Sequence, residues 1–215
     1  MTPDLPTTDA AALRDYVEGY LVEDDALTTA RARGLELGCP AVEPASGAML
    51  QFLAAALRAR AVVEIGTGAG VSGLYLLRGM AGDGVLTSID VDPEHQGAAK
   101  RAFTDARIAP GRTRLIMGRA LDVLPRLTDA AYDLLFVDAA RPEYPSYHEH
   151  GVRLLRPGGV IAFDRVLFSG VANPARRDAE ALALREVARA VRDDDRLVPV
   201  LLPVADGMLV AARAG

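Results

Sequence analysis

The stretch VVEIGTGAG, residues 62–70, combines an apolar run with a turn that contains three glycines. The apolar residues are typical of a buried β-strand, and the glycines allow the backbone that follows to turn tightly and to approach a ligand. Glycine turns after strands commonly hold phosphate groups on backbone N–H groups. Here, however, Glu64 lies just before the turn. Its carboxylate would repel a pyrophosphate and attract a ligand that carries a cationic group.

Two common nucleotide-binding patterns do not fit this turn. A dehydrogenase fingerprint, G-x-G-x-x-G, would need a third glycine where Val71 stands, and no Gly-Lys-Ser/Thr follows for a Walker motif. About twenty residues beyond the turn, Asp90 ends the next apolar run, where an acidic side chain can bind ribose hydroxyls. A positively charged nucleoside without phosphates satisfies both features, and S-adenosylmethionine is such a molecule. The alternative is an ordinary strand–helix turn with a solvated acid.

From residue 61 onward, short apolar runs alternate with amphipathic stretches. We expect strands at 61–65, 84–90, 113–118, 132–138 and 158–164, and helices at 70–80, 93–108, 119–127, 142–155 and 175–193. This alternation predicts an α/β fold with a doubly wound, mostly parallel sheet covered on both faces. Near the end, an Asp-Gly pair at 206–207 separates two apolar runs with no helix between them, which predicts a C-terminal antiparallel hairpin.

The first sixty residues are predicted to form three helices, at 7–21, 23–38 and 43–60. A Thr or Asp is expected to cap the first helix. Gly38 is expected to end the second, and Pro44 lies in the first turn of the third. At 215 residues the chain is long enough for one sizeable domain. We therefore expect a single domain over 1–215, with N-terminal helices in 1–60 and the cofactor-binding α/β core in 61–215.

Composition narrows the class of protein further. Net charge is −5 and the positive charges are scattered, so the sequence favours neither a nucleic acid nor an anionic membrane as partner. The single cysteine, Cys39, excludes an internal disulfide framework and a cysteine-based zinc site, and a small core residue is the favoured interpretation. The N-terminus does not resemble a signal peptide and no run approaches a transmembrane helix in length, so we expect a cytoplasmic protein.

Taken together, the motifs resemble those of class I S-adenosylmethionine-dependent methyltransferases, and more narrowly the small bacterial branch of the catechol and caffeoyl-CoA O-methyltransferase group. The segments that carry the resemblance are AVEPASGAMLQFL, VVEIGTGAGVSGLYL, TSIDVDP, IMGRALDVLP, YDLLFVDA, LLRPGGVIAFD and the closing hairpin. They cover nearly the whole chain in the family's order. The resemblance implies a seven-stranded Rossmann-like sheet and methyl transfer to the hydroxyl oxygen of a small acceptor, with aromatic hydroxyls as first candidates.

The resemblance also implies which residues surround the cofactor. Glu64 and the glycine turn would lie nearest the charge of its amino-acid portion, Asp90 would hold the ribose, and Asp138 would face both the sulfonium region and the acceptor. For the more apolar positions, plain core packing remains the alternative. The full set implied for the cofactor is Val42, Glu64, Gly66, Thr67, Gly68, Ser72, Asp90, Val91, Ala120, Asp138 and Ala140.

The sequence departs from the family at two catalytic positions. Catechol methyltransferases bind a divalent cation with two aspartates and an asparagine; the aspartates match Asp138 and Asp164, but the asparagine is replaced by Arg165. The lysine that activates the substrate hydroxyl is replaced by Arg141. The two aspartates should end adjacent strands, ~5 Å apart. Because arginine neither ligates metal nor deprotonates near neutral pH, we hypothesise that the Arg165 guanidinium replaces the metal as a tethered cation.

Several alternatives remain open. Asp138 and Asp164 could still bind a weak metal if Arg165 pointed into solvent, which would give a metal-dependent catechol-type enzyme. The altered positions 141 and 165 also leave room for a cofactor-binding protein without transfer activity, and a dehydrogenase is a distant possibility. Tyr144, Tyr147 and His148 are candidates for lining the acceptor pocket or assisting proton removal, or they simply cover a helix face. The N-terminal helices have more apolar surface than one sheet face needs, and relatives pair through such surfaces, so a homodimer is expected.

Overall fold

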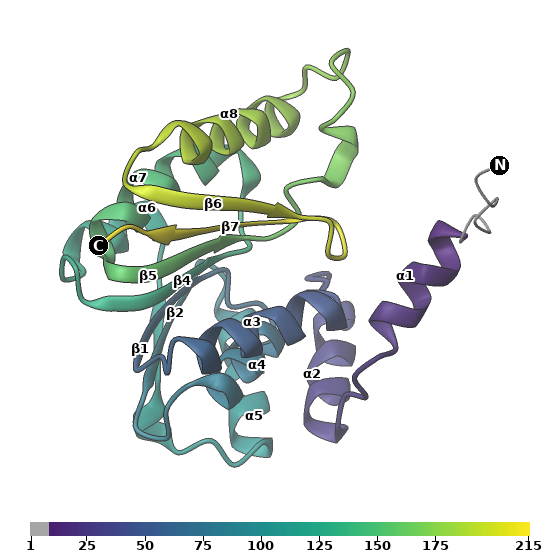
Figure 1. Cartoon of the computed structure of the whole chain (residues 1–215). Helices are drawn as coiled ribbons and strands as arrows, with labels where there is room; N and C mark the ends of the chain where they lie inside the picture. The colour runs from purple at the N-terminus through teal and green to yellow at the C-terminus, as the bar shows by residue number, and fades with distance from the viewer. Residues whose placement is uncertain (1–8) are drawn as a thin grey trace, which may run out of the picture.

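The computed structural model describes residues 9–215, apart from the side chain of Ser169, and contains one seven-stranded sheet in the order β3-β2-β1-β4-β5-β7-β6 (Figure 1). The strands are β1 (Ala61–Ile65), β2 (Val85–Asp90), β3 (Thr113–Met117), β4 (Tyr132–Val137), β5 (Leu155–Phe163), β6 (Leu197–Leu202) and β7 (Met208–Arg213). The first five are parallel, and β7 is antiparallel to both β5 and β6. The predicted doubly wound sheet with its C-terminal hairpin is confirmed.

Helices cover both faces of the sheet (Figure 1). They are α1 (Ala10–Glu18), α2 (Asp25–Glu36), α3 (Pro44–Ala56), α4 (Val71–Gly79), α5 (Pro93–Asp105), α6 (Ala120–Val123), α7 (Tyr144–Leu154) and α8 (Ala179–Asp193). Four short 3₁₀ turns lie at Pro110–Arg112, Leu124–Arg126, Arg141–Glu143 and Phe168–Gly170. No helix within residues 9–215 is both long and apolar enough to cross a lipid bilayer.

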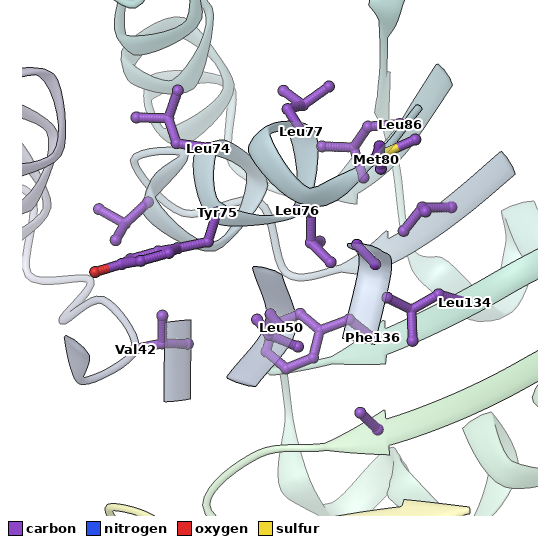
Figure 2. Packing of buried hydrophobic residues seen from close by; sticks show 14 of the residues in the cluster. Val42, Leu50, Leu74, Tyr75, Leu76, Leu77, Met80, Leu86, Leu134 and Phe136 are labelled. Atoms are coloured by element: carbon purple, nitrogen blue, oxygen red, sulfur yellow. The ribbon is translucent and has the colours of Figure 1, made fainter. Parts of the chain in front are cut away.

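Two hydrophobic clusters lie on opposite faces of the sheet. The first contains side chains of α2 to α5 together with β1, β2 and β4; Figure 2 shows part of it, including Leu50 of α3, Leu76 of α4 and Phe136 of β4. The second contains side chains of α6, α7 and α8, among them Tyr144 and Leu184. Burial of this apolar surface on both faces is the main stabilising contribution to the sheet, and it holds the helices against the strands.

Helix α3 packs closely on α4 because small residues lie at their contact. A Cβ atom at Gly79 would approach the carbonyl oxygen of Gln51 to 2.2 Å, and one at Gly47 would approach the Tyr75 ring to 2.3 Å. Either approach is far below an ordinary van der Waals contact. The glycines therefore let the N-terminal region come against the core near the end of β1, where the candidate site lies.

Several boundaries differ from those expected from the sequence. Strand β5 begins at Leu155 instead of 158, and its pairing with β4 contains a register shift between Tyr132 and Leu134. The expected helix at 119–127 is a four-residue helix followed by a 3₁₀ turn, because Pro125 cannot continue an α-helix. Asp9 caps the first helix; Thr7 and Thr8, the other candidates for that cap, lie outside the described residues.

Candidate functional site

A cavity of about 680 Å³ opens where β1, β2 and β4 end. In a parallel sheet the carboxyl ends of the strands share one edge. The order of the strands switches sides at β1, because β2 and β3 lie on one side of it and β4 and β5 on the other. The residues that follow these strands therefore converge: Gly66 after β1, Asp90 at the end of β2 and Asp138 after β4 all line the cavity. Residues 39–42, which precede α3, close another side of it.

The glycine turn packs directly against the end of β4. Gly66 has a φ of +95°, and a Cβ atom there would lie 2.0 Å from the carbonyl oxygen of Asp138. Its N–H donates to the carbonyl of Ile89. Gly70, with a φ of +91°, begins α4. Any side chain at position 66 would push β1 and β4 apart, so glycine is required for the cavity to have this shape.

Glu64 is a fully buried carboxylate next to the cavity wall. Its Oε2 accepts a 2.5 Å hydrogen bond from the Ser88 hydroxyl, which lies 2.7 Å from the Thr67 hydroxyl. Its Oε1 has no hydrogen-bond partner among residues 9–215. Burial raises the pKa of Glu64 to about 7, with the nearby Ser72 and Ser88 hydroxyls lowering it in part. A buried carboxylate with an unsatisfied oxygen favours a cation beside it.

Asp90 holds the glycine turn in place. Its Oδ2 accepts hydrogen bonds of 3.0 Å from the N–H groups of both Thr67 and Gly68, and its Oδ1 accepts one from Asp92. The sequence predicted a ribose ligand at this position. Asp90 does line the cavity, and its Oδ1, which accepts one hydrogen bond, can accept a further one, whereas Oδ2 already accepts two. The ribose role stays a prediction, to which the structure adds a second role in shaping the turn.

The structure brings most of the predicted cofactor residues to one cavity. Those that line it are Val42, Gly66, Thr67, Gly68, Ser72, Asp90, Val91, Ala120, Asp138 and Ala140. Val42 is also part of the first hydrophobic cluster, whereas Val91 is 63% exposed at the cavity edge. Of the residues predicted for catalysis, Asp138 and Arg165 line the cavity, and Arg141 and Asp164 do not.

Sequence reasoning missed His95 and Glu143 at the cavity rim, whereas the family resemblance implies that residues 118–120 border the adenine. Arg119, after β3, forms a 3.0 Å ion pair with Glu143, and Glu143 also accepts a hydrogen bond from the Tyr147 hydroxyl. His95, in the first turn of α5, lies with Nδ1 3.5 Å from Oδ1 of Asp90. His95 could have been found from its place in the sequence, because it follows closely after Asp90 at the end of β2. The rim contact of Arg119 joins loops that are distant in sequence, and no local pattern indicates it.

Asp138 and Asp164 follow adjacent strands, as predicted, but they have different partners. Nη1 of Arg165 lies 3.5 Å from Oδ1 of Asp138, whereas Oδ1 of Asp164 accepts a 3.0 Å hydrogen bond from the Ser46 hydroxyl of α3. Burial raises the pKa of both carboxyl groups, and the Arg165 charge opposes that rise. The guanidinium therefore contacts one carboxylate directly and acts on the other only through its field. Tyr144 is buried and donates to the carbonyl oxygen of Asp164.

Among the described residues, Arg141 forms its ion pair with Glu180 and not with Asp138 or Asp164. Its Nη1 is 3.2 Å from Glu180 of α8, and its guanidinium carbon is 4.4 Å from the centre of the Phe168 ring. This cation–π contact joins the turn after β4 to the loop after β5. Phe168 thus packs on Arg141. These contacts hold the loop after β4 and the loop after β5 in place.

The donor set at the two aspartates does not fit a divalent cation. Among residues 9–215 no group of three or more His, Cys, Asp or Glu side chains is placed to hold a metal ion. The third position carries the Arg165 guanidinium, which has no lone pair to donate and brings positive charge to Asp138. One oxygen of Asp164 is already engaged by Ser46. Mg²⁺ can be bound through one or two carboxylates with water as its other ligands, so the feature that disfavours a cation here is the positive charge of Arg165 beside Asp138.

This fold and cavity define an α/β protein with a nucleoside-type site at the strand ends. Residues 19–214 match the O-methyltransferase family model, and the chain belongs to that family. A provisionally assigned O-methyltransferase from Mycolicibacterium vanbaalenii is 53% identical over 212 residues, which is 98% of this chain and 94% of the relative.

Solved structures agree with this family. A protein from Corynebacterium glutamicum has a TM-score of 0.89 at 32% identity, covering 95% of this chain and 97% of its own. The O-methyltransferase TomG from Streptomyces achromogenes, involved in tomaymycin synthesis and solved in complex with S-adenosylmethionine, has a TM-score of 0.86 at 31% identity, covering 95% and 96%. These similarities confirm the predicted family and fold and support the cofactor prediction.

Proposed function

We propose that this protein is an S-adenosylmethionine-dependent O-methyltransferase that acts on a small hydroxyl acceptor without a divalent metal ion. The observation that carries the cofactor part is Glu64, a buried carboxylate with an unpartnered oxygen beside the glycine turn. An ammonium group in the cavity would offset the cost of ionising Glu64, directly or through a water molecule. S-adenosylmethionine carries such a group and no phosphate, and it supplies the methyl group on a sulfonium.

The residues that would hold this cofactor divide by chemistry. The backbone of Gly66 and Thr67 and the Ser72 hydroxyl line the cavity and suit the polar amino-acid portion, with the buried Glu64 carboxylate behind them. Asp90 suits a ribose hydroxyl because its Oδ1, which accepts one hydrogen bond, can accept another. Apolar side chains at the far end suit a purine ring; these are Ile89, Val91 and Ala120. Asp138 lies at the acceptor end of the same cavity.

The acceptor side supports a mechanism that depends on positioning and fixed charge. A hydroxyl oxygen gains nucleophilic character as it loses its proton, and a fixed guanidinium stabilises the negative charge that develops. Arg165 supplies that charge next to Asp138, in the place where the catechol-type relatives would use a metal ion. Arg141 cannot act as the base, because guanidinium stays protonated, and its contacts with Glu180 and Phe168 give it a structural part in the loop.

A methyl-transfer assay tests the proposal. The protein is incubated with radiolabelled S-adenosylmethionine and a panel of catechols, flavonoids and hydroxycinnamates, with either EDTA or Mg²⁺ present. We expect labelled product from at least one aromatic hydroxyl at the same rate in both conditions. Activity that disappears in EDTA would instead establish the metal-dependent alternative. Tight binding of the cofactor with no transfer to any acceptor would favour a binding protein without transfer activity.

We further propose a cytoplasmic homodimer with small-molecule substrates and neither nucleic-acid nor membrane partners. Support for dimerisation comes from α1, which stands away from the sheet beyond α2 (Figure 1). This helix has no buried residue, and Tyr16, Tyr20 and Val22 in and after it are strongly exposed. Exposed apolar groups of this kind are commonly covered by another chain. Light scattering after gel filtration should give twice the chain mass, and a monomer at micromolar concentration would refute the dimer.

A further inference from the structure

Arg165 has an unusual backbone conformation for an arginine. Its φ is +56°, which lies in the left-handed region. Glycine adopts this region readily, asparagine less readily, and most other residues rarely. Such a conformation costs free energy and persists only where the surrounding structure stabilises it. The position directly follows Asp164, so the turn aims the Arg165 side chain back across the end of the sheet. Arg58 and Arg107 also have positive φ, so the feature particular to Arg165 is the set of contacts that its guanidinium makes.

The guanidinium joins two parts of the site that are far apart in sequence. Nη2 donates to the carbonyl oxygens of Pro40 at 2.8 Å and of Ala41 at 3.1 Å, while Nη1 lies 3.5 Å from Asp138. Its side chain is 18% exposed, so these contacts are only partly screened by water. A single side chain therefore contacts both the acceptor-side carboxylate and the segment before α3.

That segment, residues 39–42, is a wall of the cavity with little regular structure of its own. All four of its residues line the cavity, and it lies between α2 and α3 without helix or strand. A second arginine holds its other end: Nη1 of Arg31 donates to the carbonyl of Val42 at 2.8 Å, and Arg31 is itself paired with Glu23. The Arg31 contact belongs to the N-terminal helices. The Arg165 contact is the one that connects the segment to the catalytic end of the sheet.

We propose that Arg165 is a positioning residue that holds residues 39–42 closed over the cofactor and links this closure to Asp138. The inference rests on the proposed function, since it assigns the cavity to S-adenosylmethionine. It adds a role to the one in which the Arg165 charge replaces a metal ion. Enclosure of the cofactor depends on the same side chain that lies beside Asp138. The planar fork divides these contacts between two nitrogens, Nη2 at the two carbonyl oxygens and Nη1 at the carboxylate, whereas an ammonium group donates from a single nitrogen.

Two variants separate the parts of this role. Arg165→Asn removes the guanidinium, and asparagine tolerates the left-handed backbone, so folding is preserved. Arg165→Lys keeps the charge and loses the fork. Arg112→Lys is a matched control, because Arg112 also donates to backbone carbonyls, but at the opposite edge of the sheet. Its acceptors are the carbonyl oxygens of Gly84, Leu77 and Ala81. Melting temperatures of all three variants report any general loss of stability.

The single cysteine of the chain provides the first readout. Cys39 lies in the segment itself, is partly buried, and its thiol pKa is raised by burial, so it should react slowly with a thiol reagent in the wild-type protein. If Arg165 holds the segment closed, both Arg165 variants should be labelled about tenfold faster, and Arg112→Lys should be labelled at the wild-type rate. Equal labelling of all four proteins would overturn the inference.

Calorimetry with S-adenosylhomocysteine, in EDTA, provides the second readout. We expect about tenfold weaker binding in both Arg165 variants and unchanged binding in Arg112→Lys. Wild-type and Arg165-variant affinities within twofold of each other would overturn the inference while leaving the proposed function intact. No binding by the wild-type protein would instead refute the proposed function. A fourth variant, Asp138→Asn, tests the link: it should also accelerate Cys39 labelling, because the guanidinium loses its anchor.

Discussion

The hydroxyl of Ser46 donates a 3.0 Å hydrogen bond to Oδ1 of Asp164 across 118 residues of sequence. Both side chains are buried, at 0% and 2% exposure. The bond connects the first turn of α3 to the residue after β5, so it brings the N-terminal region and the catalytic edge of the sheet together. It also occupies an oxygen that a metal ion would otherwise need. The pair Asp138 and Asp164 is thus held by Arg165 on one side and by Ser46 on the other.

The first prediction concerns metal binding. Replacing Arg165 with asparagine removes the positive charge beside Asp138 and supplies an amide oxygen, which Mg²⁺ and Mn²⁺ accept as a ligand. We expect Arg165→Asn to bind Mn²⁺ at least about tenfold more tightly than the wild-type protein, as measured by the loss of the free-ion signal in electron paramagnetic resonance. Arg112→Lys serves as the control. Wild-type protein that binds Mn²⁺ as tightly as Arg165→Asn would contradict the role of Arg165.

The second prediction is a pH dependence of stability that comes from Glu64. Burial raises its pKa from 4.5 to about 7, so the folded protein without ligand binds a proton that the unfolded chain has already lost. This contribution is fully present below pH 4.5 and is lost as the pH rises through about 7. The shift corresponds to about 3 kcal/mol, to order of magnitude. Glu64→Gln lacks the ionisation.

Urea unfolding of both proteins between pH 4.5 and 8, without cofactor, measures this effect. The free energy of unfolding of wild type should fall relative to that of Glu64→Gln as the pH rises, until the difference levels off above pH 7. Parallel pH profiles for the two proteins would show that Glu64 is already ionised in the folded state, against the interpretation of its buried oxygen.

The third prediction concerns stability alone and uses Asp133, at the opposite end of β4. Its Oδ2 accepts from the N–H groups of Arg60 and Ala61, and its Oδ1 accepts from Nε of Arg156. These partners hold its pKa below the ordinary value despite partial burial. Asp133→Ala should lower the free energy of unfolding by about 2–4 kcal/mol near neutral pH. Because Asp133 lies away from the cavity, affinity for S-adenosylhomocysteine in the folded variant should be unchanged.

The pH dependence of that loss follows from the sign of the shift. A carboxyl group with a lowered pKa stabilises the folded state above its unfolded value of 3.8, and the contribution disappears as the pH falls through the folded value. The difference between wild type and Asp133→Ala should therefore shrink in acid. A difference that stays the same below pH 3.8 would mean that Asp133 contributes through packing and not through its charge.

Much of the fold follows from local patterns in the sequence. The strand at Ala61–Ile65 has the predicted bounds because its apolar run is interrupted sharply by glycine, and the Asp206-Gly207 turn marks the hairpin without ambiguity. The convergence of Gly66 and Asp138 was predictable too, since parallel strands share a carboxyl edge. These features depend on residues close together in sequence.

Long-range side-chain contacts could not be predicted in the same way. The Ser46–Asp164 bond depends on how α3 packs against the sheet, and the contacts of Arg165 depend on a left-handed backbone that sequence does not favour for arginine. Asp90 is a further case, because its position at the strand end was predicted but its hydrogen bonds to the Thr67 and Gly68 amides were not. In each case tertiary packing decides the partner.

Isothermal titration of the wild-type protein and Glu64→Gln with S-adenosylhomocysteine in EDTA is the most direct test of the cofactor assignment. A saturable heat is predicted for the wild-type protein, about tenfold weaker binding for Glu64→Gln, and none for NAD under the same conditions. The assignment would be contradicted by a wild-type protein that shows no association with either the methyl donor or S-adenosylhomocysteine and yet binds a phosphate-bearing nucleotide.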